Sequence, residues 1–150
     1  MSARHAGLAL AAATALAGCS HIVVLNDPLT AAEHNDLGYY YETGGYPDLA
    51  KGEYQKALKR DPHLVRARVN LGNLEAGAGR WGAAEDHYRR ALRDSADADA
   101  LNNLAVALLR QRKSLDEAEE LAAKAVAGGG ERDSIYRSTL AEVRAARRGR

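Results

Sequence analysis

Phenylalanine is absent from this 150-residue chain, and cysteine and tryptophan occur once each. With a single cysteine, no disulfide can form within the chain. An excess of charge of one sign is also missing. Arg4 is the only charged residue before Cys19, which leaves 20 basic and 20 acidic residues in the remainder. This neutral balance gives no support for broad nucleic-acid binding.

The motifs of common catalytic and metal sites are missing as well. The five histidines show no metal-ligand spacing, and no G-x-S-x-G, H-E-x-x-H or phosphate-binding loop occurs. The glycine run at 128–130 lacks the lysine and the following Ser or Thr of a phosphate loop. The acidic residues Glu117, Glu119 and Glu120 are typical of the solvated side of a helix. We therefore expect no catalytic residue, no metal and no cofactor.

The segment before Cys19 has the features of a secretory signal. It begins with a short polar stretch containing Arg4 and continues with an apolar run at residues 6–17. That run is shorter than the ~20 residues that a membrane-spanning helix needs. Leu16-Ala17-Gly18-Cys19 resembles the lipobox of bacterial lipoproteins. The resemblance implies that residues 1–18 form a lipoprotein signal peptide and that Cys19 becomes lipidated; an ordinary free thiol is the alternative.

The same resemblance implies a location and a short tether. Lipoprotein chemistry adds more than one acyl chain to the cysteine, and more than one chain makes anchoring stable. Ser20 follows Cys19 where Asp would favour inner-membrane retention, so we expect a lipid anchor in the outer membrane, facing the periplasm. The tether comprises residues 19–29, and its nine residues after Ser20 reach at most ~30 Å at ~3.3 Å per residue. Its apolar part, Ile22–Leu25, either rests on the first helix or docks on a partner as a strand.

A pattern at residues 37–62 recurs further along the chain with a period of 34 residues. The recurring pairs are Leu37 and Leu71, Gly38 and Gly72, Ala50 and Ala84, Tyr54 and Tyr88, and Ala57 and Ala91. L-G-x-x-Y followed by A-x-x-x-aromatic and proline at this period resembles the tetratricopeptide (TPR) repeat. The resemblance implies an all-α fold, an α-solenoid of about three TPR helix pairs with a C-terminal capping helix.

Local signals set the limits of the helices in this TPR domain, residues 30–150. Thr30 and Glu33 have the spacing of a capping box, Gly44-Gly45 ends the first helix, and Pro47 suits the first turn of the second. The third repeat is degenerate. The last helix carries an apolar stripe of Ile135, Leu140 and Val143, through which the chain could also form a homodimer. The repeats cover about residues 31–64, 65–97 and 98–130, and the capping helix covers about 133–148.

Repeat 2 departs from the pattern at Glu75, which stands where repeat 1 has the aromatic Tyr41. Two other features have alternative interpretations. We expect Trp81 to pack at the turn between two helices, and an exposed binding residue is the alternative. The C-terminal arginines suit the end of a helix, where cations are favoured; binding of phosphate or anionic lipid is the alternative. These arginines are Arg144, Arg147, Arg148 and Arg150.

The first helices of TPR pairs line a concave side, which members of this family use to hold a peptide or a helix. The lining positions flank the Leu-Gly pair of each repeat. By this resemblance they are Asn35, Asp36, Tyr39 and Glu42 in repeat 1, Arg66, Asn70, Asn73 and Ala76 in repeat 2, and Asp99, Asn102, Asn103, Val106 and Arg110 in repeat 3.

Asparagine is frequent among these positions. An asparagine amide both donates and accepts hydrogen bonds, so it can pair with a peptide backbone irrespective of the peptide's sequence; a consensus role in the fold is the alternative. TPRs that hold a chaperone's C-terminal carboxylate have basic residues where this chain has Asn35, Asp99 and Asn103. Without those cations a free carboxylate would be poorly held.

The resemblance to TPR lipoproteins implies a non-catalytic adaptor whose partner is an envelope protein or peptide, with no nucleic acid bound. We expect the chain to recruit an envelope peptidase or cell-wall hydrolase through its groove. A structural or pilot subunit of a pilus or secretion complex is the alternative.

Overall fold

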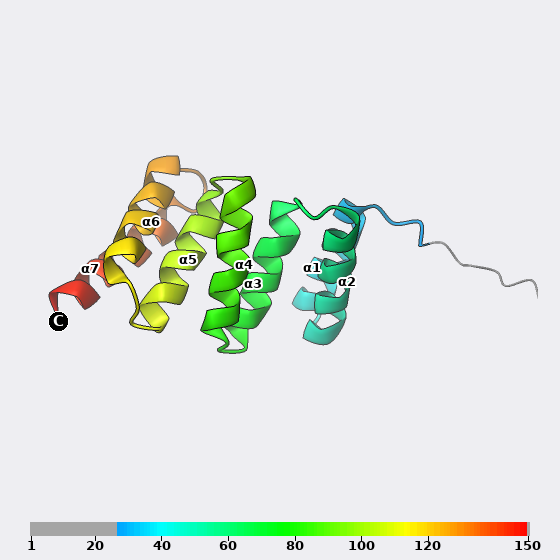
Figure 1. Cartoon of the computed structure of the whole chain (residues 1–150), viewed down its shortest axis with the longest axis horizontal. Coiled ribbons are helices and arrows are strands. Elements are labelled where there is room, and N and C mark those ends of the chain that lie inside the picture. Colours follow the sequence, from blue (N-terminus) through cyan, green and yellow to red (C-terminus); the bar gives the residue numbers. More distant parts are fainter. Residues whose placement is uncertain (1–26, 150) are drawn as a thin grey trace, which may run out of the picture.

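The computed structural model describes residues 27–149, in which seven α-helices and no β-strand occur. Three antiparallel pairs, α1–α2, α3–α4 and α5–α6, stack side by side and α7 covers the last pair (Figure 1). The predicted all-α solenoid of three helix pairs and an end helix is confirmed. The helices are α1 (Ala31–Thr43), α2 (Pro47–Arg60), α3 (Val65–Gly77), α4 (Trp81–Asp94), α5 (Ala98–Arg110), α6 (Leu115–Gly128) and α7 (Asp133–Arg148).

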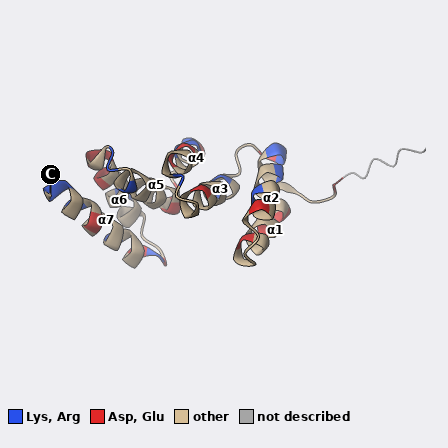
Figure 2. Cartoon of the chain, turned by 90° about the horizontal axis from the view of Figure 1, so that it is seen from below, with Lys and Arg blue, Asp and Glu red and all other residues tan. Residues whose placement is uncertain are grey.

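The proposed signal peptide, Cys19 and the Ile22–Leu25 segment lie outside the described residues. Within residues 27–149, no helix is both long enough and apolar enough to span a membrane. Charged residues of both signs are distributed along the stack, in keeping with the neutral composition (Figure 2).

The predicted capping box is present at the start of α1. The Thr30 hydroxyl accepts a hydrogen bond from the Glu33 backbone N–H at 3.2 Å, and the Glu33 carboxylate accepts one from the Thr30 N–H at 2.7 Å. Gly45 adopts a φ of +82° just after the helix, and Pro47 opens α2. This tight turn makes α1 and α2 antiparallel neighbours.

We expect Thr30→Ala to lower the free energy of unfolding by about 1 kcal/mol, because the first turn of α1 loses a hydrogen-bonded cap. Chemical denaturation measures this change. Ser138→Ala is the control, since this exposed serine within α7 makes no hydrogen bond through its side chain within residues 27–149. Equal unfolding midpoints for the two variants would contradict a capping role for Thr30.

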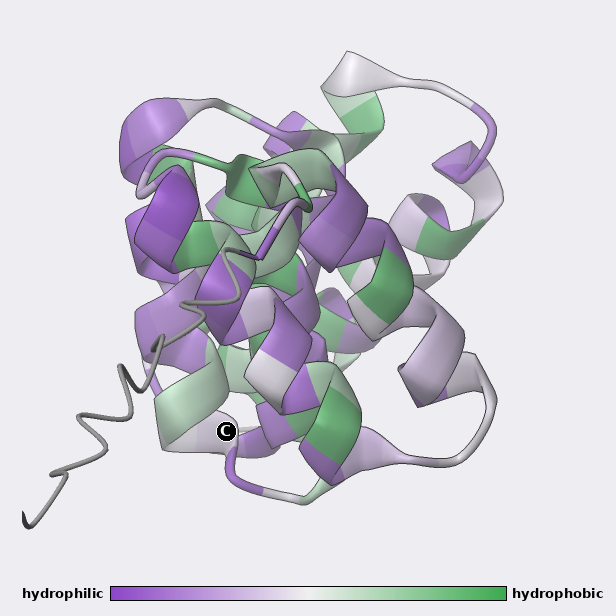
Figure 3. Cartoon of the chain, turned by 90° about the vertical axis from the view of Figure 1, so that its right-hand side faces the viewer, coloured by the Kyte–Doolittle hydropathy of each residue, from purple (hydrophilic) through white to green (hydrophobic). Residues whose placement is uncertain are grey.

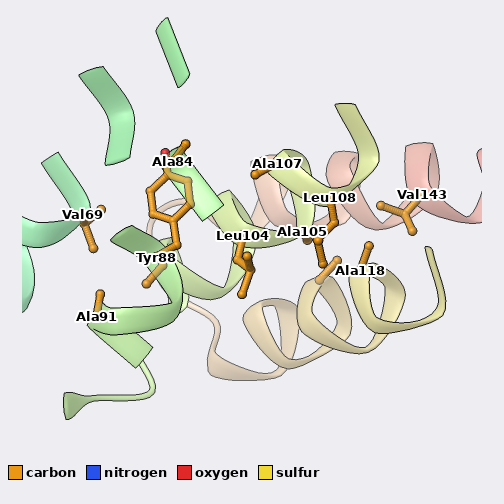
Figure 4. Packing of buried hydrophobic residues seen from close by; sticks show 12 residues of the cluster. Val69, Ala84, Tyr88, Ala91, Leu104, Ala105, Ala107, Leu108, Ala118 and Val143 are labelled. Atoms are coloured by element: carbon orange, nitrogen blue, oxygen red, sulfur yellow. The ribbon is translucent and has the colours of Figure 1, made fainter. Parts of the chain in front are cut away.

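The buried apolar side chains form two clusters. The larger cluster joins repeats 2 and 3 with α7 and includes Tyr88, Leu104, Leu108 and Val143 (Figure 4). The smaller cluster consists of Ala50, Tyr54 and Leu71 at the junction of repeats 1 and 2. Hydrophobic and hydrophilic segments lie next to one another in the ribbon when the stack is viewed along its length (Figure 3). A single helix pair cannot bury its apolar residues alone, so neighbouring pairs bury them by stacking.

The Leu-Gly motif has a direct steric cause. A Cβ atom added to Gly38 would lie 2.5 Å from Cε1 of Tyr54, and one added to Gly72 would overlap the ring of Tyr88. The tyrosine of the second helix therefore occupies the space that a side chain on the first helix would need. Repeat 3 has Ala105 at the glycine position and Ala122 at the tyrosine position, and both are fully buried. The larger residue on one helix is thus accompanied by a smaller residue on the other.

Buried ionisable groups connect neighbouring elements. Glu75, only 5% exposed, accepts hydrogen bonds from Lys51 at 2.9 Å and from Arg80. Hydrogen bonds from Arg80 and Lys51 lower the pKa of Glu75 to about 2. Glu75, which replaces the aromatic of repeat 1, therefore forms ion pairs that link α3 to α2 and to the residue preceding α4. A buried histidine makes a similar link, because His34 contacts Glu53 at 2.7 Å through Nδ1.

The apolar stripe predicted for the last helix is partly wrong. Ile135 is 53% exposed, whereas its neighbour Tyr136 is buried together with Thr139 and Val143. Helix α7 packs against both α5 and α6, and the face that it buries there carries Tyr136 rather than Ile135.

The structure also shows which residues surround Trp81 and the C-terminal arginines. Trp81 is half-buried and packs against the larger cluster, as predicted. Of the C-terminal arginines, Arg144 contacts Glu119 at 2.8 Å and Arg147 contacts Asp116 at 2.5 Å. Acidic side chains of α6 therefore neutralise part of this cluster.

Candidate functional site

A hollow with a volume of about 720 Å³ lies along the first helices of the three pairs. We call it the groove. Helices α1, α3 and α5 supply most of its lining, and the turns preceding α3, α5 and α7 supply the rest. Its lining residues are Asn35, Asp36, Tyr39, Glu42, Leu64, Val65, Arg66, Val69, Asn70, Asn73, Ser95, Asp97, Asp99, Asn103 and Arg132.

Most of the predicted site residues lie in or beside this groove. Asn35, Asp36, Tyr39, Glu42, Arg66, Asn70, Asn73, Asp99 and Asn103 are lining residues. Ala76 and Val106 line a smaller adjoining hollow with Trp81, and this hollow shares Asn73 and Asn103 with the groove.

Asn102 and Arg110 do not line the groove, contrary to the prediction. Asn102 is 4% exposed, and its side-chain amide donates to the side-chain oxygen (Oδ1) of Asn103 at 3.4 Å. Its position, two residues before the leucine of the Leu-Gly motif, is also buried in the other repeats, at Asn35 and Val69. Arg110 is exposed at the end of α5, beyond the lining.

Sequence reasoning missed six lining residues. Leu64, Ser95, Asp97 and Arg132 lie outside or at the edges of the helices, and Val65 and Val69 are apolar residues of α3. Asp97 carried one usable signal, because an Asp just before a helical pattern is a typical N-cap. It does cap α5 by accepting from the Ala100 N–H at 2.8 Å.

Asparagine pairs connect the first helices across the floor of the groove. The Asn70 amide of α3 donates to Asn35 of α1 at 3.0 Å, and the Asn103 amide of α5 donates to Asn73 of α3 at 3.0 Å. These asparagines therefore hold successive repeats together. Within residues 27–149, the side-chain oxygen of Asn70 (Oδ1) and the side-chain nitrogen of Asn73 (Nδ2) take no part in a hydrogen bond. One acceptor and one donor thus remain available to a ligand.

Tyrosine hydroxyls donate hydrogen bonds to two carboxylates that line the groove. Tyr54 donates to Glu42 at 2.6 Å, and Tyr136 donates to Asp99 at 2.7 Å. Burial, together with the hydrogen bond to Asp99, raises the pKa of Tyr136 to about 12. Burial likewise raises the pKa of Tyr54. Both hydroxyls therefore remain protonated donors at neutral pH and fix the orientation of the carboxylates.

The groove carries more negative than positive charge. Asp36 contacts Arg66 at 3.6 Å, and Asp99 contacts Arg132 at 3.1 Å. No group of three or more potential metal ligands occurs within residues 27–149. The arrangement offers hydrogen-bonding amides and oriented carboxylates to a ligand, which suits recognition of a polypeptide.

Comparisons with known proteins agree with this architecture. A tetratricopeptide repeat family model matches residues 35–98 and 69–133. The first TPR of Spaghetti (RPAP3), bound to the HSP90 peptide SRMEEVD, is 17% identical with a TM-score of 0.70, over 82% of this chain and 97% of that one. The Pseudomonas aeruginosa PilF structure is 25% identical with a TM-score of 0.71, over 82% of this chain.

This chain spans 56% of the PilF chain, and the comparison with curated proteins gave no match. The family model covers most of the helical region, and the two solved structures share its fold. The chain therefore belongs to the tetratricopeptide repeat family, whose fold is a scaffold for protein–protein interaction.

Proposed function

We propose that this protein is a non-catalytic adaptor that holds a segment of another protein in the groove. The observation that supports this function most is the polar floor of the groove, where Asn70 and Asn73 keep hydrogen-bonding groups for a ligand. Such groups can pair with a peptide backbone whatever its sequence. The TPR of Spaghetti, of similar fold, was solved with a bound peptide.

We further propose that the adaptor works at the bacterial envelope. The lipobox ending at Cys19 supports lipidation and anchoring in the outer membrane on the periplasmic side. The short tether would keep the groove close to the membrane. In this setting the bound segment would belong to an envelope peptidase or a cell-wall hydrolase, which the adaptor would recruit.

A subunit of a pilus or secretion complex is the second candidate. The similarity to the Pseudomonas aeruginosa PilF structure is the observation that favours it. Because this chain spans 56% of that protein, the second candidate concerns only the helical region that the two share.

Site-specific crosslinking in the native host tests the adaptor function. A photoreactive amino acid replaces Asn103 in the groove of the full chain, so the proposed anchor at Cys19 stays in place. The control carries the same amino acid at Lys124, which is exposed on α6 and outside the groove. We expect a protein adduct from position 103 and none from position 124.

The identity of the adduct separates the two candidates. A soluble hydrolase or peptidase supports recruitment, and a multimeric outer-membrane complex supports the second candidate. In the same strain, Asn73→Ala should reduce the yield of the adduct while circular dichroism shows a folded protein. No adduct from the groove, or an equal yield from both positions, would refute the proposed function.

A further inference from the structure

The negative charge of the groove is a local property. The whole chain carries a formal net charge of +1, but four carboxylates and only two guanidinium groups line the groove. Asp36 and Asp99 are paired with those two arginines. Glu42 and Asp97 have no cationic partner within residues 27–149.

These two carboxylates are held in place by the protein. Glu42 accepts from the hydroxyl of Tyr54, which is fully buried, through one oxygen at 2.6 Å. Asp97 accepts from the Ala100 N–H through one oxygen at 2.8 Å. The second oxygen of each carboxylate takes no part in a hydrogen bond within the described chain. Because the side chains are already oriented, binding a cation costs little conformational entropy.

We propose that the groove selects a cationic segment, a peptide whose lysine or arginine side chains pair with Glu42 and Asp97. This inference rests on the proposed function and specifies the chemistry of the partner. The Asn70 and Asn73 amides contribute to affinity for any backbone, whereas the carboxylates discriminate by charge. An acidic segment such as the SRMEEVD peptide bound to Spaghetti would bring its carboxylates close to those of the groove, which disfavours binding.

Selection from a random peptide library tests this inference. The full chain, immobilised in detergent, is exposed to a displayed library of random peptides, and the net charge of the enriched pool is compared with that of the input. The double variant Glu42→Gln/Asp97→Asn is the test. Gln at 42 can still accept from Tyr54, and Asn at 97 is still a good N-cap, so the fold should be retained.

The control is Glu120→Gln/Glu142→Gln, which makes the same change of net charge at exposed positions outside the groove. We expect the wild type and this control to enrich cationic peptides. Their affinity for the best peptide should fall with added salt. The Glu42→Gln/Asp97→Asn protein should bind the same peptide roughly tenfold more weakly, as two modest ion pairs are lost.

A neutral or acidic pool, or no enrichment over the input, would overturn the inference. A cationic preference that persists in Glu42→Gln/Asp97→Asn would also overturn it. Crosslinking from position 103 separates this failure from a failure of the adaptor function. If the groove still gives a specific adduct in the host, the adaptor stands and only the charge of its partner segment is wrong.

Discussion

Gly72→Ala is expected to lower the free energy of unfolding by about 3 kcal/mol, the largest effect that we expect from a single substitution. The added methyl group would overlap the ring of Tyr88, which is 2% exposed and packed within the larger cluster. Neither helix can yield without opening the contact between α3 and α4. Denaturant unfolding should show the loss, and thermal unfolding should show a midpoint lower by about 10 °C.

Gly52→Ala is the matched control. Gly52 lies in the middle of α2, and a Cβ atom added there would meet nothing within 4 Å. Because alanine is a better helix former than glycine, this control should gain about 0.5–1 kcal/mol. A double-mutant cycle with Tyr88→Leu isolates the steric cause, since the cost of Gly72→Ala should shrink once the ring is gone. If Gly72→Ala behaves like Gly52→Ala, the close approach of the Leu-Gly motif to the tyrosine is not a packing constraint.

Most of the fold could be predicted from the sequence because the signals for the helices are local or repeat at a fixed period. The Thr30 capping box, the Gly44-Gly45 turn and Pro47 act within a few residues of one another, and the structure contains each of them. The 34-residue period then identifies which helices pair, since neighbouring repeats must stack to bury their apolar faces. These signals do not depend on contacts that are distant in the sequence.

The groove was only partly predictable because its lining depends on how the helices are rotated and on distant turns. The resemblance to the family predicted Asn102 in the groove. In the structure its side chain is buried and donates a hydrogen bond to the side chain of Asn103. Arg132, which precedes α7, reaches the groove because the last helix folds back on α5. Its contact with Asp99 has no signature in the local sequence.

The role of Glu75 also required the structure. The sequence showed that a carboxylate replaces an aromatic residue, but it did not show that Lys51, 24 residues earlier, is the partner. A buried carboxylate that is paired in this way should make stability depend on pH. The pKa of Glu75 is about 2 in the folded protein, compared with an ordinary value of 4.5. As the pH falls, the unfolded chain therefore takes up this proton first, and folding loses the contribution of Glu75 between about pH 5 and pH 2.

Glu75→Gln should lower the free energy of unfolding by about 2 kcal/mol at neutral pH. The shift alone would correspond to a larger value, but Lys51 and Arg80 are 43% and 57% exposed and solvent screens their charges. Urea unfolding of both proteins over a range of pH measures the difference, which should shrink toward zero at about pH 2. Glu120→Gln, an exposed change on α6, should leave the curve of the wild type unaltered. If the difference between wild type and Glu75→Gln stays constant with pH, the substitution weakens packing or hydrogen bonds rather than an ion pair. In that case the charge of Glu75 does not join α3 to α2 and Arg80.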